Sequence, residues 1–235
     1  MSPSDGDHAE RGIPFPRQIR SFVRREGRMS KHRAAAYDAL FSQYGLTFNA
    51  HRLDFTALFG RSAPVILEIG FGMGDSLAAM AINNPDTNFL GIEVHRPGIG
   101  KLLAIIDEKQ ISNIRIFCHD AVEVLEHMIS DHSLDGVQIF FPDPWPKKRH
   151  HKRRLIQPAF VRLLAQKLKL DGTLHLATDW EHYAQWIMEI LAASPDFARL
   201  PDNTPHQRPT TKFEKRGLQL GHGVWDMIYV RKAGR

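Results

Sequence analysis

Hydrophobic residues follow a regular alternation from position 64 onward, in which short apolar runs precede segments of helical composition. Apolar runs of four to eight residues bounded by turns are typical of buried strands. Such strands separated by helices predict an α/β protein with a mostly parallel sheet covered on both faces. We expect strands over 65–70, 88–94, 114–118, 135–141 and 173–179, and helices over 76–83, 99–108, 121–129, 157–169 and 181–193.

The two ends of the chain depart from this alternation. Residues 34–62 contain a helical segment, and residues 224–230 form an apolar run with no helix after it, which suits an antiparallel strand. Residues 1–33 lack periodicity, and from Arg11 to Arg33 there are eight Lys or Arg residues against one acid. This composition predicts a flexible basic arm ahead of a single domain over 34–235. Nucleic-acid contact and simple solubility are both open as roles for the arm.

Each of the first four strands ends at or beside an acidic residue. The separations of these acids along the chain are 25, 27 and 23 residues, one strand-and-helix unit apiece. Ligands of an open α/β sheet bind outside the carboxyl ends of its strands, so the four side chains should meet at one edge. A single acid there is often only a helix cap, whereas four in succession indicate a ligand site. The four acids are Glu68, Glu93, Asp120 and Asp143.

A glycine-rich loop follows the first strand, with Gly70, Gly72 and Gly74 at alternate positions. Glycine lets the backbone turn tightly and approach a ligand closely, just before a helix N-terminus. A dinucleotide fingerprint places its third glycine at position 75, where this chain has Asp75. Glu93 lies 23 residues after Gly70, where an acid can bind the two hydroxyls of a ribose. The spacing favours S-adenosylmethionine over a nicotinamide cofactor.

The most distinctive stretch of the chain runs from Phe140 to Arg154. Asp143 lies between two prolines, Trp145 follows, and six Lys or Arg residues come next with two histidines. A carboxylate and an aromatic ring beside clustered cations suggest chemistry on a polyanion, and a rigid turn with a solvated basic loop is the alternative. Trp145 either stacks on an unpaired base or closes the strand end as a buried ring. We expect Arg149, Lys152, Arg153 and Arg154 to contact phosphates, and Lys147 to contact a phosphate or Asp143.

Composition and charge narrow the class of protein. The 235 residues are 43% hydrophobic, enough for a sizeable core, and the net charge of +5 favours an anionic partner. The single cysteine excludes an internal disulfide and fits a reducing compartment. No apolar run reaches the roughly 20 residues of a membrane span, and no signal-peptide pattern opens the chain. We therefore expect a cytoplasmic protein, and no metal site, because His150 and His151 lack a third ligand at metal spacing.

The chain resembles the bacterial tRNA (guanine-N7-)-methyltransferase family over roughly residues 30 to 232. The resemblance rests on LEIGFGMGDS, NFLGIEVHRPGIG, FFPDPWPKKRHHKRR, LATDWEHYA and TKFEKRG. It implies a class I methyltransferase fold, a Rossmann-like three-layer sandwich with a seven-stranded, mostly parallel sheet whose last strand is antiparallel. It also implies methylation of N7 of the guanine at position 46 in the tRNA variable loop. The methyl donor would be S-adenosylmethionine, leaving S-adenosylhomocysteine.

The resemblance also implies roles for individual residues. Those that match Glu68, Glu93, Asp120 and Asp143 bind the donor together with the glycine loop. Those that match Lys147, Asp179, Thr211, Lys212, Phe213 and Glu214 face the substrate.

Asp143 is expected to be the central catalytic residue. Guanine N7 is an acceptor that carries no proton in the free base, so its methylation needs no general base. A fixed carboxylate can instead stabilise the cationic purine that forms. Methylation of another RNA or of protein, a nicotinamide-dependent oxidoreductase and a non-catalytic RNA-binding module remain alternatives. The oligomeric state, monomer or homodimer, and the range of tRNAs also stay open.

Overall fold

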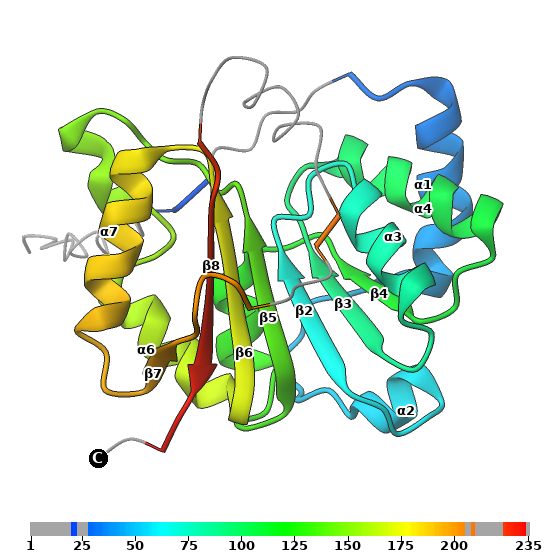
Figure 1. Ribbon diagram of the computed structural model, residues 1–235. Helices are drawn as coiled ribbons and strands as arrows, with labels where there is room; N and C mark the ends of the chain where they lie inside the picture. The colour runs from blue at the N-terminus through cyan, green and yellow to red at the C-terminus, as the bar shows by residue number, and fades with distance from the viewer. Residues whose placement is uncertain (1–19, 23–27, 205–207, 210–222, 234–235) are drawn as a thin grey trace, which may run out of the picture.

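The computed structural model describes residues 20–22, 28–204, 208–209 and 223–233. An eight-stranded sheet runs through them in the order β1-β4-β3-β2-β5-β6-β8-β7 (Figure 1). Strand β8 is antiparallel to both of its neighbours, and all other neighbouring strands are parallel. The strands are β1 (Gly45–Leu46), β2 (Val65–Ile69), β3 (Asn88–Ile92), β4 (Ile114–Phe117), β5 (Leu134–Phe140), β6 (Leu168–Thr178), β7 (Phe197–Arg199) and β8 (Trp225–Arg231).

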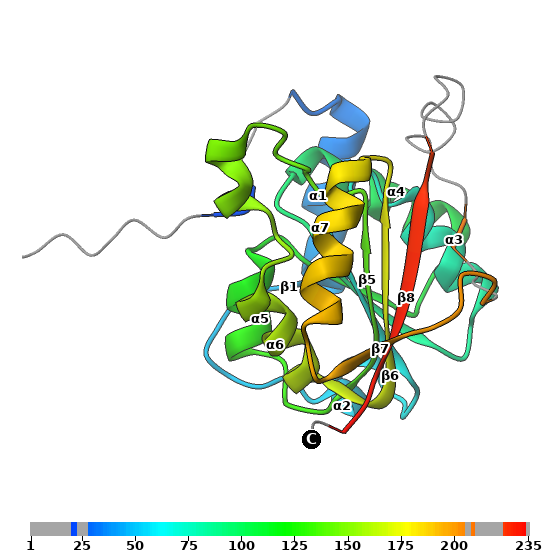
Figure 2. The same cartoon turned by 60° about the vertical axis from the view of Figure 1, so that its left-hand side comes forward.

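Helices cover both faces of the sheet (Figure 2). One apolar cluster joins the strands to α5, α6 and α7, and a second joins them to α3 and α4, against which α1 also packs. Burial of these apolar faces against the sheet is the main stabilising term of such a three-layer arrangement. The helices are α1 (Lys31–Tyr44), α2 (Phe55–Phe59), α3 (Asp75–Asn83), α4 (Arg96–Lys109), α5 (Ala121–His127), the 3-10 helix η1 (Lys148–Arg153), α6 (Pro158–Lys167) and α7 (Glu181–Ala192).

The predicted elements are confirmed, and their order along the chain is as expected. The seven implied strands correspond to β2 through β8, with the antiparallel strand last in the sequence. The two-residue β1 was not expected, and neither the chain pattern nor its length distinguishes such a short strand from a loop. Helix α1 begins at Lys31, inside the stretch expected to belong to the arm. No helix within the described ranges is long and apolar enough to cross a membrane.

The strand order reverses between β2 and β5. From β2 the chain builds outward through β3 to β4, and it then returns to place β5 on the other side of β2. The loops that leave β2 and β5 therefore run to opposite sides and open a crevice at the carboxyl edge of the sheet. The glycine loop follows β2 and the Pro142–Pro144 turn follows β5, so both border this crevice.

A close backbone contact fixes the glycine loop against helix α4. A Cβ atom placed on Gly98 would lie only 1.9 Å from the carbonyl oxygen of Gly72. Gly98 is the third residue of α4, so only a residue without a side chain lets the start of this helix pass behind the loop.

We expect Gly98→Ala to lower the free energy of unfolding by about 1–3 kcal/mol, because the added methyl group must displace backbone. Alanine normally stabilises a helix by about 1 kcal/mol relative to glycine, so the sign of the effect identifies the contact. Gly223→Ala is the control, since its Cβ would meet only the Trp225 ring, at 3.3 Å. Urea denaturation checks the expectation, and a Gly98→Ala protein as stable as the wild type would contradict it.

Candidate functional site

A cavity of about 700 Å³ opens at the carboxyl edge of the sheet, in the crevice between the β2 and β5 loops. Its volume lies within the range of small-molecule sites, about 300–1,000 Å³. Five residues singled out in the sequence line it together: Gly70, Glu93, Asp120, Asp143 and Trp145. The expected convergence of acidic residues is thus present for three of the four.

The glycine loop leaves room in front of its backbone. Gly70, Gly72 and Gly74 all have positive φ, at 76°, 56° and 77°, a region that costs other residues about 1 kcal/mol or more. A Cβ atom on Gly70 or Gly72 would meet no atom within 4 Å, so the space there is open. Gly74 differs, because a Cβ there would lie 2.6 Å from Leu102. Gly70 therefore lines the cavity, Gly72 borders open space, and Gly74 permits packing against α4.

Backbone amides hold the Glu93 carboxylate in place. Its Oε2 accepts a hydrogen bond from the Gly72 N–H (2.8 Å), and its Oε1 accepts from the N–H groups of Val94 (2.6 Å) and His95 (3.0 Å). A carboxylate has about four lone-pair positions, so these bonds leave one on Oε2. Glu93 therefore links the glycine loop to the end of β3 and keeps one acceptor position for a ligand.

Glu68 lies behind this carboxylate, fully buried in the middle of β2. Burial, with a further contribution from the negative charge of Glu93, raises the pKa of Glu68 to about 8. Its side chain does not line the cavity, and its Oε2 has no hydrogen-bond partner among the described residues. The raised pKa favours the neutral form of Glu68, and its side chain lies outside the cavity lining, whereas the resemblance implied a donor-binding residue at this position.

Asp120 lines the cavity and also caps helix α5. Its Oδ1 accepts a hydrogen bond from the Val122 N–H at 2.9 Å. The helix-cap and ligand-binding interpretations of this residue are therefore compatible, because the cap bond uses only one of the two carboxylate oxygens.

The turn that carries Asp143 is held in an unusual backbone conformation. Phe141 and Trp145 on either side have φ values of 51° and 44°, which bulky residues rarely adopt and which cluster at functional sites. The Phe141 N–H donates to the Ala177 carbonyl of β6 (2.8 Å), which fixes where the turn starts. The Asp143 side chain is exposed at the cavity wall.

Trp145 joins the cavity wall to the N-terminal segment. Its Nε1–H donates to the Ser21 carbonyl (3.0 Å), and the Arg153 guanidinium lies 4.2 Å from the centre of its ring. Arg153 also donates to the Phe22 carbonyl (3.3 Å). Ser21 and Phe22 themselves line the cavity. The sequence did not point to them, because the first 33 residues carry no periodicity.

The basic stretch forms helix η1 beside the cavity, and its exposed members are Lys147, Lys148, Arg149 and Lys152. The field they create is visible in a neighbouring side chain. Loss of solvent contact, together with the positive charges of Arg149 and Lys147, lowers the pKa of His150. The helix therefore presents a cationic surface.

Arg154 does not fit its predicted role as a phosphate contact. It is buried, donates through Nε to the Pro144 carbonyl (2.9 Å), and lies over the rings of Tyr183 (4.9 Å) and Trp186 (5.1 Å). A guanidinium enclosed in this way cannot reach a surface phosphate. It instead connects the Asp143 turn to α7, a contact that spacing along the sequence does not reveal.

Of the remaining predicted substrate residues, the structure describes only Asp179. Asp179 directly follows β6, whose end pairs with the end of β5, so it lies on the same edge as Asp143 although it does not line the cavity. Thr211, Lys212, Phe213 and Glu214 lie outside the described residues.

A buried ionic cluster that the sequence did not indicate lies beside Phe140 and Phe141. Arg208 donates through Nε and Nη2 to the two carboxylate oxygens of Asp226 (2.9 and 2.6 Å), and His175 contacts the same carboxylate at 2.9 Å. Burial acts against ionisation of Asp226, but hydrogen bonds from His175 and Arg208 hold its pKa well below the usual range. The Arg208 guanidinium also lies 5.6 and 5.5 Å from the two phenylalanine ring centres.

The described part of the chain contains no group of three or more His, Cys, Asp or Glu side chains arranged to hold a metal ion.

Comparison with protein families gives a match over residues 62–227 to a family model described as "Putative methyltransferase". Curated relatives named tRNA (guanine-N(7)-)-methyltransferase match nearly the whole chain. The protein from Yersinia enterocolitica is 54% identical over 92% of both chains, that from Pseudoalteromonas atlantica 52% identical over 98% of both, and that from Methylobacillus flagellatus 55% identical over 92% of both.

Solved structures with the same fold are more distant in sequence. The 16S rRNA methyltransferase KamB superposes with a TM-score of 0.53 at 14% identity, over 76% of this chain and 93% of that chain. An rRNA methylase from Streptococcus thermophilus gives 0.51 at 10% identity, over 73% and 88%. At these identities the likeness concerns the fold alone.

The raised pKa of Glu68 makes stability depend on pH. Between pH 4.5 and about 8 the folded protein holds a proton on Glu68 that the unfolded chain has lost. Stability should therefore fall as pH rises through this range, by up to about 1.4 kcal/mol per pH unit, and level off above it. We expect Glu68→Gln, which cannot ionise, to lose less stability than the wild type between pH 5 and 8 in urea denaturation. Parallel pH profiles would contradict the assignment.

Proposed function

The chain belongs to the tRNA (guanine-N(7)-)-methyltransferase family, and we propose that it transfers a methyl group from S-adenosylmethionine to N7 of a guanine in tRNA. The structural observation that supports this most directly is the meeting of the glycine loop, Glu93 and Asp143 in one cavity. A donor held by the first two would present its methyl group near a carboxylate suited to the target base. The proposed site is position 46 in the variable loop, as the sequence resemblance implies.

The residues of the cavity fit this donor. The open space before Gly70 and Gly72 admits a ligand close to the backbone, and Glu93 retains an acceptor position for a ribose hydroxyl. When bound, the donor supplies an electrophilic methyl group on a positively charged sulfur. Asp120 and Asp143 add carboxylate oxygens to the cavity lining, which favour a cationic ligand. We propose these residues as the donor site, with Glu68 acting from behind the loop rather than by contact.

Methyl transfer to N7 requires the protein to align the reacting atoms and to stabilise the charge that develops. Guanine N7 offers an in-plane lone pair and no proton, so no residue has to act as a base. Alignment of the reacting atoms can itself account for about 7–11 kcal/mol of the barrier. We propose that Asp143 accepts hydrogen bonds from the guanine N–H groups and offsets the positive charge that develops on the purine. Its exposure at the cavity wall leaves it accessible to a base.

We propose the tRNA-binding residues from their charge and from their position at the carboxyl edge of the sheet. Exposed Lys147, Arg149 and Lys152 would contact phosphates, Arg153 would hold Trp145 beside the cavity, and Asp179 would face the base from the end of β6. Thr211, Lys212, Phe213 and Glu214 are proposed as substrate contacts on the resemblance. Residues 34–235 are proposed to act as one methyltransferase domain, with the arm contributing Ser21 and Phe22 to the cavity wall.

Asp143→Ala should bind tRNA with near-normal affinity but methylate it at least about 100-fold more slowly in a single turnover, because the developing charge loses its counterion. Asp143→Asn tests the charge at constant shape and should be almost as slow. Asp86→Asn removes an exposed acid elsewhere and should leave the rate unchanged. Rapid-quench assays with labelled donor measure the step, and a normal rate for Asp143→Ala would refute the assignment.

Arg149→Gln combined with Lys152→Gln should weaken tRNA binding and reduce the slope of log affinity against log salt by about two, one unit for each phosphate that is no longer neutralised. Arg154→Lys keeps the charge but removes the fork that bonds the Pro144 carbonyl. We expect it to leave the salt slope unchanged and to slow methyl transfer. Binding titrations at several salt concentrations separate the two, and an unchanged slope for the double variant would show that η1 is only solvated surface.

A further inference from the structure

We propose a second tRNA-binding surface on the far side of the cavity from η1, formed by Arg28, Lys31 and Arg33 at the start of α1 with Arg96 at the start of α4. This inference rests on the proposed function, because it takes tRNA as the substrate. It adds a binding surface that neither the motifs nor the cavity assigns.

Contacts place this cationic surface at the edge of the site. Arg96 follows His95, which lines the cavity, and its guanidinium lies 4.6 Å from the centre of the Tyr37 ring of α1. Arg33 approaches Met73 of the glycine loop at 3.9 Å. A Cβ on Gly100 would lie only 2.6 Å from the Arg33 carbonyl, so α1 and α4 pack closely here. The first turns of both helices therefore form one surface that reaches the cavity.

The cations of this surface have no acid partner in the part of the chain that the structure describes. Arg28, Lys31, Arg33 and Arg96 form no ion pair with an acid of the described residues, and the same holds for the exposed cations of η1. At the opposite edge of the sheet, Lys109 pairs with Glu108, Lys167 with Asp131 and Lys169 with Asp135, whereas Arg61, Arg115 and Arg231 bond to uncharged groups there.

A polyanion can bind to cations that have no acid partner, and such cations are present on two surfaces beside the cavity. Cations that already pair with a carboxylate gain less from a phosphate, since binding must first break the existing pair. The unpaired cations have no carboxylate to release, so they can bind the phosphates of RNA directly and displace its counterions. Position at the rim of the cavity distinguishes these unpaired cations from those at the opposite edge.

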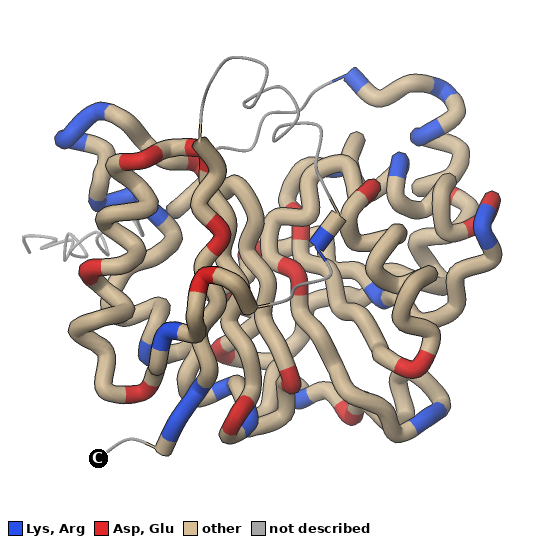
Figure 3. The backbone as a smooth tube through the Cα atoms, in the orientation of Figure 1, with Lys and Arg blue, Asp and Glu red and all other residues tan. Residues whose placement is uncertain are grey.

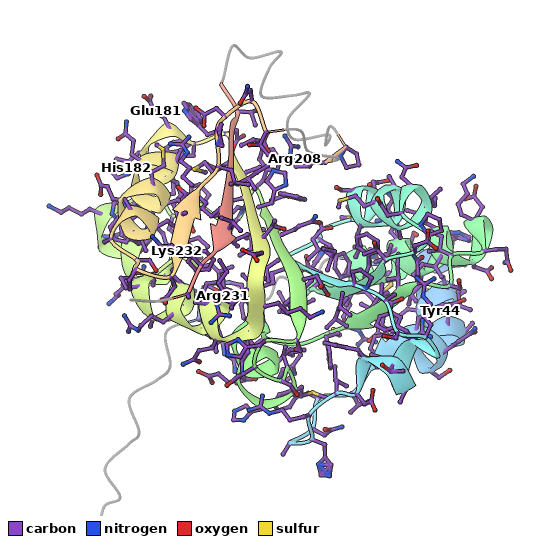
Figure 4. All side chains as sticks on the ribbon, turned by 60° about the horizontal axis from the view of Figure 1, so that its bottom comes forward. Tyr44, Glu181, His182, Arg208, Arg231 and Lys232 are labelled. Carbon is purple, nitrogen blue, oxygen red and sulfur yellow. The ribbon has the colours of Figure 1, made fainter. Side chains whose placement is uncertain are left out.

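The two cationic surfaces lie at opposite ends of that edge. The sheet order places β4 and β1, with α1, on one side of the central β2–β5 pair, and β6, with η1 and α7, on the other. Figure 3 shows Lys and Arg at both upper ends of the molecule, and Figure 4 shows Tyr44 of α1 and His182 of α7 on opposite sides. A strand of tRNA whose target guanine enters the cavity would therefore have phosphates beside both surfaces.

The test removes two exposed cations from α1 and its approach. Arg28→Gln combined with Lys31→Gln should weaken tRNA binding about tenfold or more at 0.1 M salt and lower the salt slope by about two. Combination with Arg149→Gln and Lys152→Gln should lower it by about four, because the surfaces are separate and their effects add. The charge-preserving variant Arg28→Lys/Lys31→Arg should keep the wild-type slope.

The matched control removes two cations from the opposite edge, as Lys109→Gln/Lys169→Gln, and should leave the slope unchanged. Equal slopes for the α1 variant and the wild type, with wild-type methylation of tRNA intact, would overturn the second surface but leave the proposed function standing. An equal weakening of binding in the α1 variant and the control would also overturn it, since net charge would then explain both. A wild-type protein that neither binds nor methylates tRNA would instead refute the proposed function.

Discussion

The reversal of strand order between β2 and β5 is the constraint on which the rest of the site depends. Because neighbouring crossovers leave the sheet in opposite directions there, the glycine loop and the Asp143 turn border the same crevice without any long insertion. The close packing of Gly98 against Gly72 then fixes the loop from one side, and the bond from Phe141 to Ala177 fixes the turn from the other. A donor and a base can therefore meet between two rigid backbones.

Positive charge serves two separate purposes in this protein. Arg154 and Arg208 are buried and bond to a backbone carbonyl or a carboxylate, so they hold the segments around Phe140–Trp145 in place. A buried cation with a partner is costly to disturb, because removal leaves the partner unpaired. The exposed cations of η1 and α1 have no acid partner in the described ranges and remain available to a polyanion. Burial, and not residue type, separates the two uses.

The sequence was sufficient for the fold but only partly for the site. Apolar runs predicted β2 to β6 and β8, because each of these strands is long enough to produce a pattern, whereas β1 and β7 are too short. Spacing placed Glu93, Asp120 and Asp143 on one edge correctly. It could not distinguish buried Arg154 from its exposed neighbours, because the side chains of adjacent residues in a basic run point in different directions. Nor could it show that Ser21 reaches Trp145 across more than one hundred residues.

The negative charges of the cavity follow from the same geometry. Burial and the nearby charge of Glu93 raise the pKa of Glu68, and three backbone amides bond the Glu93 carboxylate. The raised pKa of Glu68 favours a protonated group behind the loop, and the carboxylate of Glu93 lies at the cavity wall. Asp143 faces the same space from β5. In the proposed reaction positive charge passes from the donor to the base, so we propose that carboxylates on both sides of its path stabilise it at the start and at the end, and no proton has to move.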